Sequence, residues 1–218
     1  MDRSTRELLT ERWKQTLDAV ERFGGETEPL IIEPPASLEE VIKLEDHIGV
    51  SLPEGIRDML LTFSRKVSFY WSLPEGIGRF DEFPNIFCGD FQWSIEFLET
   101  FNNYKGKWIN EVFSDPTNTY DAVWHKKFAF LSVGNGDYLT VDTAPDRIPT
   151  VVYLSHDGGQ GHGRHLGADF TDFILRWSRL GCVGAEDWQW MSFAPSGGYL
   201  DPDCTAAKLF RCRLDLNM

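Results

Sequence analysis

The spacing of apolar residues changes abruptly near residue 66, and this change constrains the fold more than any other sequence feature. Within residues 5–23, 38–48 and 53–63, apolar side chains recur every three or four positions, as in Leu9, Trp13 and Leu17, which is typical of helices with one buried face. Over residues 67–73 they alternate, as in a strand. Because the chain lacks the regular strand–helix–strand alternation of a parallel sheet, the pattern predicts an α+β fold.

Caps and turns set the boundaries of individual elements. Ser37 and Glu40 have the spacing of a capping box, the clearest helix start in the chain. The Asn135-Gly136 pair favours a tight hairpin, and the prolines of residues 28–35 predict a linker on the surface. Glycines make residues 156–163 a loop. The predicted helices cover 5–23, 38–48, 53–63, 91–104 and 169–180, with a terminal helix from Asp203, and the predicted strands cover 67–73, 127–133, 138–142 and 150–155.

The chain is strongly acidic. Its 21 Lys and Arg residues against 34 Asp and Glu residues give a net charge of −13, which is spread over both halves. A surface of this sign repels phosphate backbones, so direct binding of nucleic acid is disfavoured. The same field accelerates encounter with a basic protein, although it also serves solubility alone.

Length and composition limit the class of protein further. With 218 residues, 42% of them hydrophobic, the chain is predicted to form a single domain over 1–218. Neither an apolar run long enough to span a membrane nor an exported leader is present, so we expect a cytoplasmic protein without membrane contact. The four cysteines are too few for a disulfide framework and are expected to be free thiols.

A histidine-rich loop offers the main enzymatic alternative. His156, Asp157, His162 and His165 lie within ten residues, and such side chains can hold Zn²⁺ in a hydrolase. The spacing matches neither a His-Glu-x-x-His helix nor paired Cys-x-x-Cys ligands. Ser155 precedes His156, but neighbours on an extended chain point to opposite sides and do not form a triad. We therefore expect no catalytic residues, no metal and no cofactor.

The tryptophans fall into two groups. Those that lie on apolar stripes of the predicted elements are expected in the core; they are Trp13, Trp71, Trp93 and Trp177. Those outside any stripe are candidate anchors of a protein interface; they are Trp124, Trp188 and Trp190.

Two stretches resemble a known family when their order and spacing are taken together. The first contains Pro34–Glu45, Ile48–Glu54 and Leu60–Phe63; the second contains Gly136–Asp142, Val151–Asp157 and Asp169–Trp177. Together they resemble the SUKH superfamily, which includes bacterial immunity proteins and the fungal Smi/Knr cell-wall regulators. The resemblance covers a core over 33–180, preceded by an N-terminal helix in 1–24 and followed by a Trp-rich extension over 181–218.

The resemblance implies a SUKH (Smi/Knr-like) α+β fold with a central, mainly antiparallel sheet flanked by helices, and no enzymatic activity. It also implies a bacterial immunity protein that binds and neutralises a polymorphic toxin. The net charge favours a basic toxin, such as a nuclease, that is occluded by a carboxylate-rich surface. Alternatives are a regulatory protein-binding scaffold and a metal-dependent hydrolase that uses the loop over 156–165. Candidate acidic contacts in predicted loops are Glu75, Asp81, Glu82, Asp90, Asp115 and Asp121.

Overall fold

Alternating side chains build a three-stranded antiparallel sheet. In the computed structural model, which describes residues 1–74, 80–195, 198–216 and 218, strand β2 (Lys66–Ser72) alternates between buried and half-buried residues. It pairs with β1 (Glu26–Ile32) on one side and with β3 (Cys88–Ser94) on the other. Buried side chains such as Trp71 and Phe91 all point to one face of this sheet.

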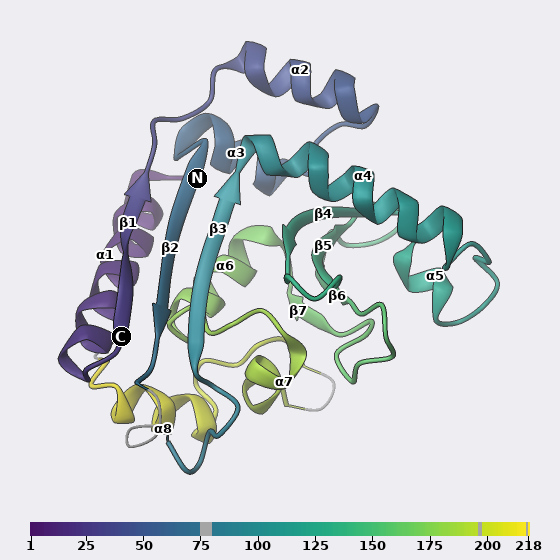
Figure 1. Ribbon diagram of the computed structural model, residues 1–218. Coiled ribbons are helices and arrows are strands. Elements are labelled where there is room, and N and C mark those ends of the chain that lie inside the picture. The colour runs from purple at the N-terminus through teal and green to yellow at the C-terminus, as the bar shows by residue number, and fades with distance from the viewer. Residues whose placement is uncertain (75–79, 196–197, 217) are drawn as a thin grey trace.

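A second antiparallel sheet holds the remaining strands in the order β4-β5-β6-β7. Its strands are β4 (Lys127–Ser132), β5 (Tyr138–Asp142), β6 (Val151–Leu154) and β7 (His165–Gly167). The predicted hairpin joins β4 to β5, and its turn uses the positive φ angles of Gly134 and Gly136. The sheet structure is thus antiparallel as expected, but it is divided into two sheets that lie side by side (Figure 1).

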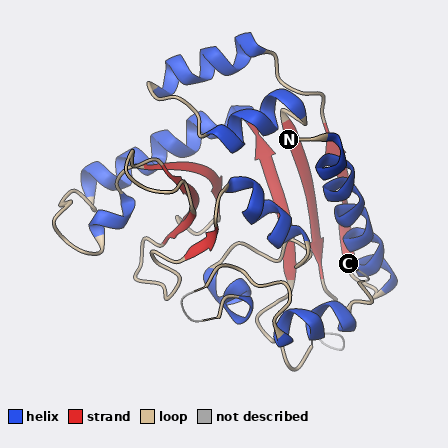
Figure 2. Cartoon of the chain, turned by 180° about the vertical axis from the view of Figure 1, so that it is seen from behind, coloured by secondary structure: helices blue, strands red, loops and turns tan. Residues whose placement is uncertain are grey.

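Helices cover one face of the three-stranded sheet. The helical elements are α1 (Arg3–Arg22), α2 (Leu38–Ile48), α3 (Glu54–Thr62), α4 (Ile95–Glu111), α5 (Asp121–Trp124), α6 (Phe170–Ser178), α7 (Asp187–Trp190), the 3-10 helix η1 (Met191–Phe193) and α8 (Thr205–Arg213). Helices α1 and α6 lie over the face seen in Figure 2. Within the described residues, no helix has both the length and the apolar character needed to cross a membrane.

Aromatic residues from distant parts of the chain meet in the main core. Trp13 of α1 packs against Phe69 and Phe91, with ring centroids 5.8 and 5.7 Å apart. The Trp71 indole donates a 2.7 Å hydrogen bond to the carbonyl of Gly181. The same core runs from Leu9 to Leu216, so the segments outside residues 33–180 contribute to it. The four tryptophans predicted for the core are all buried.

The sequence interpretation was wrong at two strands. Residues 28–35 are not simply a linker, because Glu26–Ile32 forms β1, whose pairing shifts register between Glu28 and Ile31 around Pro29. Proline is tolerated there because β1 is an edge strand. The helix predicted over 91–104 begins at Ile95, since residues 88–94 form β3.

The best predicted elements carry strong local signals. Both hydrogen bonds of the Ser37 capping box are present at the start of α2, and Gly49 ends that helix with a left-handed φ of 73°. Asp169 caps α6 as expected. Strand β7 and the short helix α7 were not predicted; both are too short to show a hydrophobic period.

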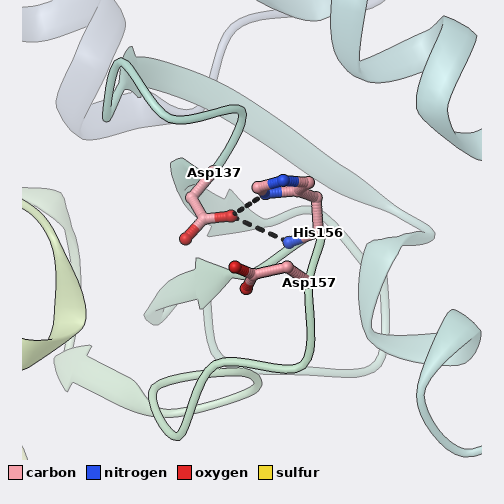
Figure 3. Close-up of side chains that lie close together, drawn as sticks. All are labelled: Asp137, His156 and Asp157. Atoms are coloured by element: carbon pink, nitrogen blue, oxygen red, sulfur yellow. Dashed lines mark hydrogen bonds and ion pairs between the residues drawn. The ribbon is translucent and has the colours of Figure 1, made fainter.

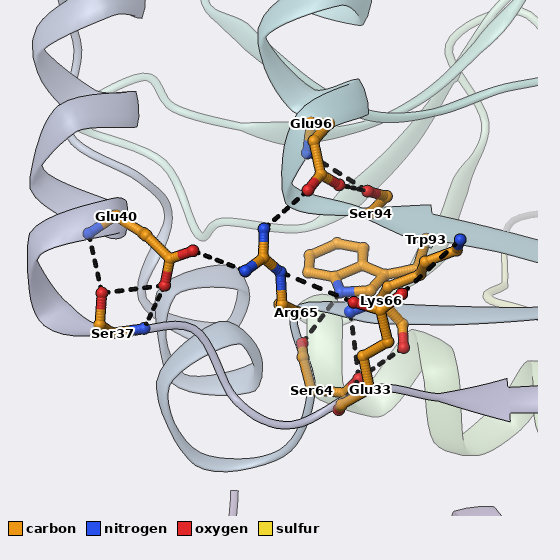
Figure 4. Close-up of polar contacts among 9 residues, drawn as sticks. All are labelled: Glu33, Ser37, Glu40, Ser64, Arg65, Lys66, Trp93, Ser94 and Glu96. Atoms are coloured by element: carbon orange, nitrogen blue, oxygen red, sulfur yellow. Dashed lines mark hydrogen bonds and ion pairs between the residues drawn. The ribbon is translucent and has the colours of Figure 1, made fainter.

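Arg65 joins three segments at one end of the three-stranded sheet. Its guanidinium lies 2.6 Å from Oε1 of Glu40 in α2 and 2.7 Å from Oε1 of Glu96 in α4, with Glu33 at 3.7 Å (Figure 4). The hydrogen bond from Arg65 to Glu96 raises the pKa of Arg65. Glu40 also completes the capping box at Ser37, so one carboxylate caps α2 and ties it to the sheet.

We expect Arg65→Met to lower the free energy of unfolding by about 1 kcal/mol, because three carboxylates lose their shared cation. The pKa of Glu40 is lowered by the Ser37 amide and that of Glu96 by the Ser94 hydroxyl, with Arg65 contributing to both. Their stabilisation is therefore present at neutral pH and lost as pH falls through these lowered pKa values. Urea denaturation at pH 7 and pH 3 measures both effects. Arg3→Met, which breaks the exposed pair with Glu7, is the control and should change nothing measurable.

Candidate functional site

The fold brings part of the histidine-rich loop next to the β4–β5 hairpin. Asp137, at the end of the hairpin turn, accepts hydrogen bonds at Oδ1 from Nδ1 of His156 at 2.7 Å and from its backbone amide at 2.8 Å (Figure 3). Asp157 lies beside them, and the ligand atoms of the three residues are within 4.8 Å of one another. Asp137 was not predicted as a partner, because 19 residues separate it from His156.

Most ligand atoms of this cluster already make hydrogen bonds within the protein. The second oxygen of Asp137 accepts hydrogen bonds from the Tyr153 hydroxyl at 2.6 Å and from the Asn135 amide at 3.1 Å. Both oxygens of the buried carboxylate are therefore engaged, and Asp157 accepts a hydrogen bond from Ser155. A metal ion would have to displace these internal bonds. The arrangement instead fastens the hairpin turn to the end of β6.

The remaining loop histidines face other partners. The His162 ring stacks on Tyr120 with centroids 3.7 Å apart; its Nδ1 accepts from the Ser155 amide and its Nε2 donates to the Tyr120 carbonyl. Burial lowers the pKa of His162, which favours the neutral ring. His165 is hydrogen-bonded to Thr150. The histidines thus do not converge on one point, and the Ser155 hydroxyl donates to Asp157 rather than to His156.

The acidic residues chosen from the sequence do not gather in one patch. Asp81 and Asp115 are exposed in loops, whereas Glu82 forms an ion pair with Arg213. Asp121 was predicted in a loop but begins helix α5, where it accepts a hydrogen bond from the Asp115 amide. The segments 80–86 and 112–120 lie far apart in both views, beside α8 and beside α5 (Figure 1). Glu75 lies outside the described residues.

Two of the three candidate anchor tryptophans are buried in the folded chain, so their side chains are not available to a partner at its surface. Trp124 is fully buried and stacks on Phe113 with centroids 4.4 Å apart. Trp190 is buried, and its indole donates a 3.0 Å hydrogen bond to the Ala185 carbonyl. The helices that carry them, α5 and α7, are only four residues long and show no apolar period, yet both tryptophans pack inward. Trp188 alone of the three is exposed, at 38%.

Asp90 lies in strand β3, which corrects its prediction as a loop residue. No helix of the described chain covers the face of the sheet seen in Figure 1, and Asp90 points to that face with the half-buried side chains of β2. The register pairs Glu28 with Tyr70 and Tyr70 with Asp90, which places the three in one row across the strands. We call this the open sheet face, defined by Glu28, Ser68, Tyr70, Asp90 and Gln92.

The Asp90 carboxylate is partly desolvated and, within the described residues, has no hydrogen-bond or ion-pair partner. Burial raises its pKa from 3.8 to about 6. Burial also raises the pKa of Cys88 and of Glu186, and the charges of Asp90 and Glu186 both act on the Cys88 thiol. A half-buried carboxylate without a counterion favours a cation supplied from outside.

Helix α7 extends the open sheet face at its Cys88 end. Trp188 stacks on Phe87 with ring centroids 5.6 Å apart, and Gln189 contacts the Cys88 sulfur at 3.8 Å. Glu186 precedes this helix. We call Glu186 and Trp188 the α7 rim. The sequence analysis missed the combined surface because a helix was predicted over residues 91–104 and Asp90 was placed in a loop, although residues 88–94 alternate between polar and apolar side chains as in a strand.

Over the described residues these features define an acidic α+β protein of two antiparallel sheets. Its loop histidines make internal hydrogen bonds, and its open sheet face presents a carboxylate, Asp90, that none of these residues pairs. A family model described as SMI1 / KNR4 family (SUKH-1) matches residues 35–176, and the chain belongs to this family. The match confirms the resemblance found in the sequence. No curated protein matches the chain. Membership is consistent with a non-enzymatic role as an immunity or scaffold protein.

Proposed function

We propose that this chain is a bacterial immunity protein that binds a basic toxin in the cytoplasm and neutralises it by occlusion. The observation that carries the proposal is membership of the SUKH-1 family over residues 35–176. The net charge of −13 supports a basic partner. A toxin that cleaves nucleic acid fits best, because its active groove must attract phosphate and would also attract carboxylates.

The open sheet face and the α7 rim are the proposed contact surface. Desolvation destabilises the charged form of Asp90 in the free protein, so a Lys or Arg of the toxin placed beside it would supply an ion pair that the described residues do not provide. Trp188 adds an exposed aromatic ring next to this charge, and aromatic residues are frequent anchors of interfaces. Asp81 and Asp115 lie away from this face and would act through long-range attraction.

Co-expression with the candidate toxin tests the proposal. A toxin encoded by a neighbouring gene should arrest growth, and the wild-type chain should restore it. We expect Trp188→Ala combined with Asp90→Lys to weaken toxin binding by at least 100-fold, since the variant removes an aromatic anchor and reverses the central charge. Surface plasmon resonance measures the affinity. Asp81→Lys with Asp115→Lys should slow association and reduce its dependence on salt.

Asp18→Lys is the matched control, because it makes the same charge reversal at an exposed position on α1, which packs on the covered side of the sheet. It changes the net charge by the same amount as Asp90→Lys, so it separates the effect of position from that of net charge for the contact-surface variant. Unchanged toxin binding by the Trp188→Ala/Asp90→Lys variant would contradict the proposed surface. Capture of several unrelated proteins at modest affinity would favour the scaffold alternative.

A further inference from the structure

One pocket of this acidic protein is lined by lysines. It has a volume of about 460 Å³ and is formed by the connection between α2 and α3, the middle of α4 and the start of β4. The lining side chains are Ile48, Val50, Ser51, Asn102, Lys105, Lys126, Lys127, Phe128 and Thr143. Among the described residues, three lysines and no carboxylate line this pocket, in a chain of net charge −13.

Lys105 is the unusual member of this group. It is only 8% exposed, and within the described residues its ammonium group has no hydrogen-bond or ion-pair partner. Lys127, in contrast, is paired with Asp142 at 3.1 Å. Buried lysines are rare unless they are paired, because desolvation of an ammonium group is costly. The pocket is the place where a counterion for Lys105 can bind.

The position of Lys105 is fixed by the helix that carries it. Asn102, one turn earlier in α4, donates to the Ala129 carbonyl at 2.8 Å and accepts from the Ala129 amide at 2.9 Å. These two bonds hold α4 against β4 and keep Lys105 at the pocket wall. Burial, followed by the charge of Lys127, lowers the pKa of Lys105 to about 8, so the group is still mainly protonated at pH 7.

We propose that this pocket binds a small organic anion, with the Lys105 ammonium group as the anchor for its carboxylate or phosphate. The hydroxyls of Ser51 and Thr143 supply neutral donors. The apolar side chains of Ile48, Val50 and Phe128 would contact the organic part of the ligand. The proposal does not depend on toxin binding, since the pocket is separate from the open sheet face.

Benzoate, phenyl phosphate and inorganic phosphate are the probes, because they separate carboxylate from phosphate and the anionic group from the apolar ring. We expect benzoate or phenyl phosphate to bind the full chain in isothermal titration calorimetry, and more tightly than inorganic phosphate. Lys105→Met should weaken that binding at least tenfold. Lys107→Met, at an exposed position on the same helix, should stay within twofold of wild type.

Nuclear magnetic resonance of the lysine side-chain amines supplies a readout that needs no variant. Bound anion should raise the pKa of Lys105 and shift its Nζ resonance, and affinity should fall tenfold for each pH unit above about 8. The proposal is overturned if none of the three probes shifts that resonance at millimolar concentration, or if Lys105→Met binds as tightly as wild type. Circular dichroism of Lys105→Met establishes that the variant is folded.

Discussion

Lys127→Met is expected to lower the free energy of unfolding by about 3 kcal/mol, because it leaves the buried carboxylate of Asp142 without its main counterion. The side chains of Lys127 and Asp142 are only 4% and 2% exposed, and they lie 3.1 Å apart across β4 and β5. The Lys127 ammonium also donates to the His125 carbonyl. Urea denaturation at pH 7 measures the loss, and the change should appear in the midpoint rather than the slope.

Arg147→Met is the control for this prediction. Arg147 lies 3.7 Å from the same carboxylate of Asp142, but its side chain is 70% exposed, so its removal should cost less than about 0.5 kcal/mol. Adding Asp142→Leu to Lys127→Met should recover much of the lost stability, because no unpaired charge is then buried. A loss below about 1 kcal/mol for Lys127→Met alone would mean that water solvates Asp142.

Asp90→Asn is expected to stabilise the free protein by about 2 kcal/mol at pH 7.5, because it removes a desolvated charge that has no partner in the described structure. The folded-state pKa of Asp90, about 6, is above its ordinary value of 3.8, so the folded protein holds this proton more tightly than the unfolded chain. The stability linked to this proton is complete below about pH 4 and is lost as pH rises through 6. The gain from Asp90→Asn should therefore vanish at pH 4.

Denaturation curves of wild type and Asp90→Asn at both pH values measure this effect. Asp81→Asn makes the same substitution at an exposed loop position and should leave stability within about 0.5 kcal/mol at either pH. Equal stability of Asp90→Asn and wild type at pH 7.5 would contradict a desolvated Asp90. If the open sheet face binds a basic toxin, the same variant should bind that toxin more weakly while folding more stably, as is common for functional residues.

Local sequence signals were sufficient to predict the elements whose ends are set by nearby capping or turn residues. Ser37 with Glu40, the Asn135-Gly136 turn and Asp169 each specify a boundary through contacts within a few residues. Strand β3 was missed because Trp93 and Phe97 are spaced as on a helix while Phe91 and Trp93 are spaced as on a strand, and periodicity alone does not separate the two.

The candidate functional site could not be predicted from the sequence, because it is formed by contacts between residues far apart in the chain. Asp90 is enclosed partly because its backbone amide donates to the carbonyl of Cys182, 92 residues further along the chain. Asp137 and His156 meet because β5 and β6 pair and place their flanking turns together. The residue types of the histidine-rich loop offered a metal site only as an alternative, and the tertiary structure shows which hydrogen bonds those residues already make. Burial of Trp124 and Trp190 was likewise set by packing between distant segments.

Residues 182–184 approach β3 closely, and this contact limits where the chain can be truncated. Val183 bridges to Gly89, where an added Cβ would lie 2.3 Å from the Cys182 carbonyl, and Val183 also accepts the indole hydrogen bond of Trp177. Trp13 fills the same core from the other end of the chain. A fragment cut at the limits of the family match would lack both pieces and expose aromatic surface. The segment that matches the family is therefore shorter than the stretch of chain that contributes side chains to this one core.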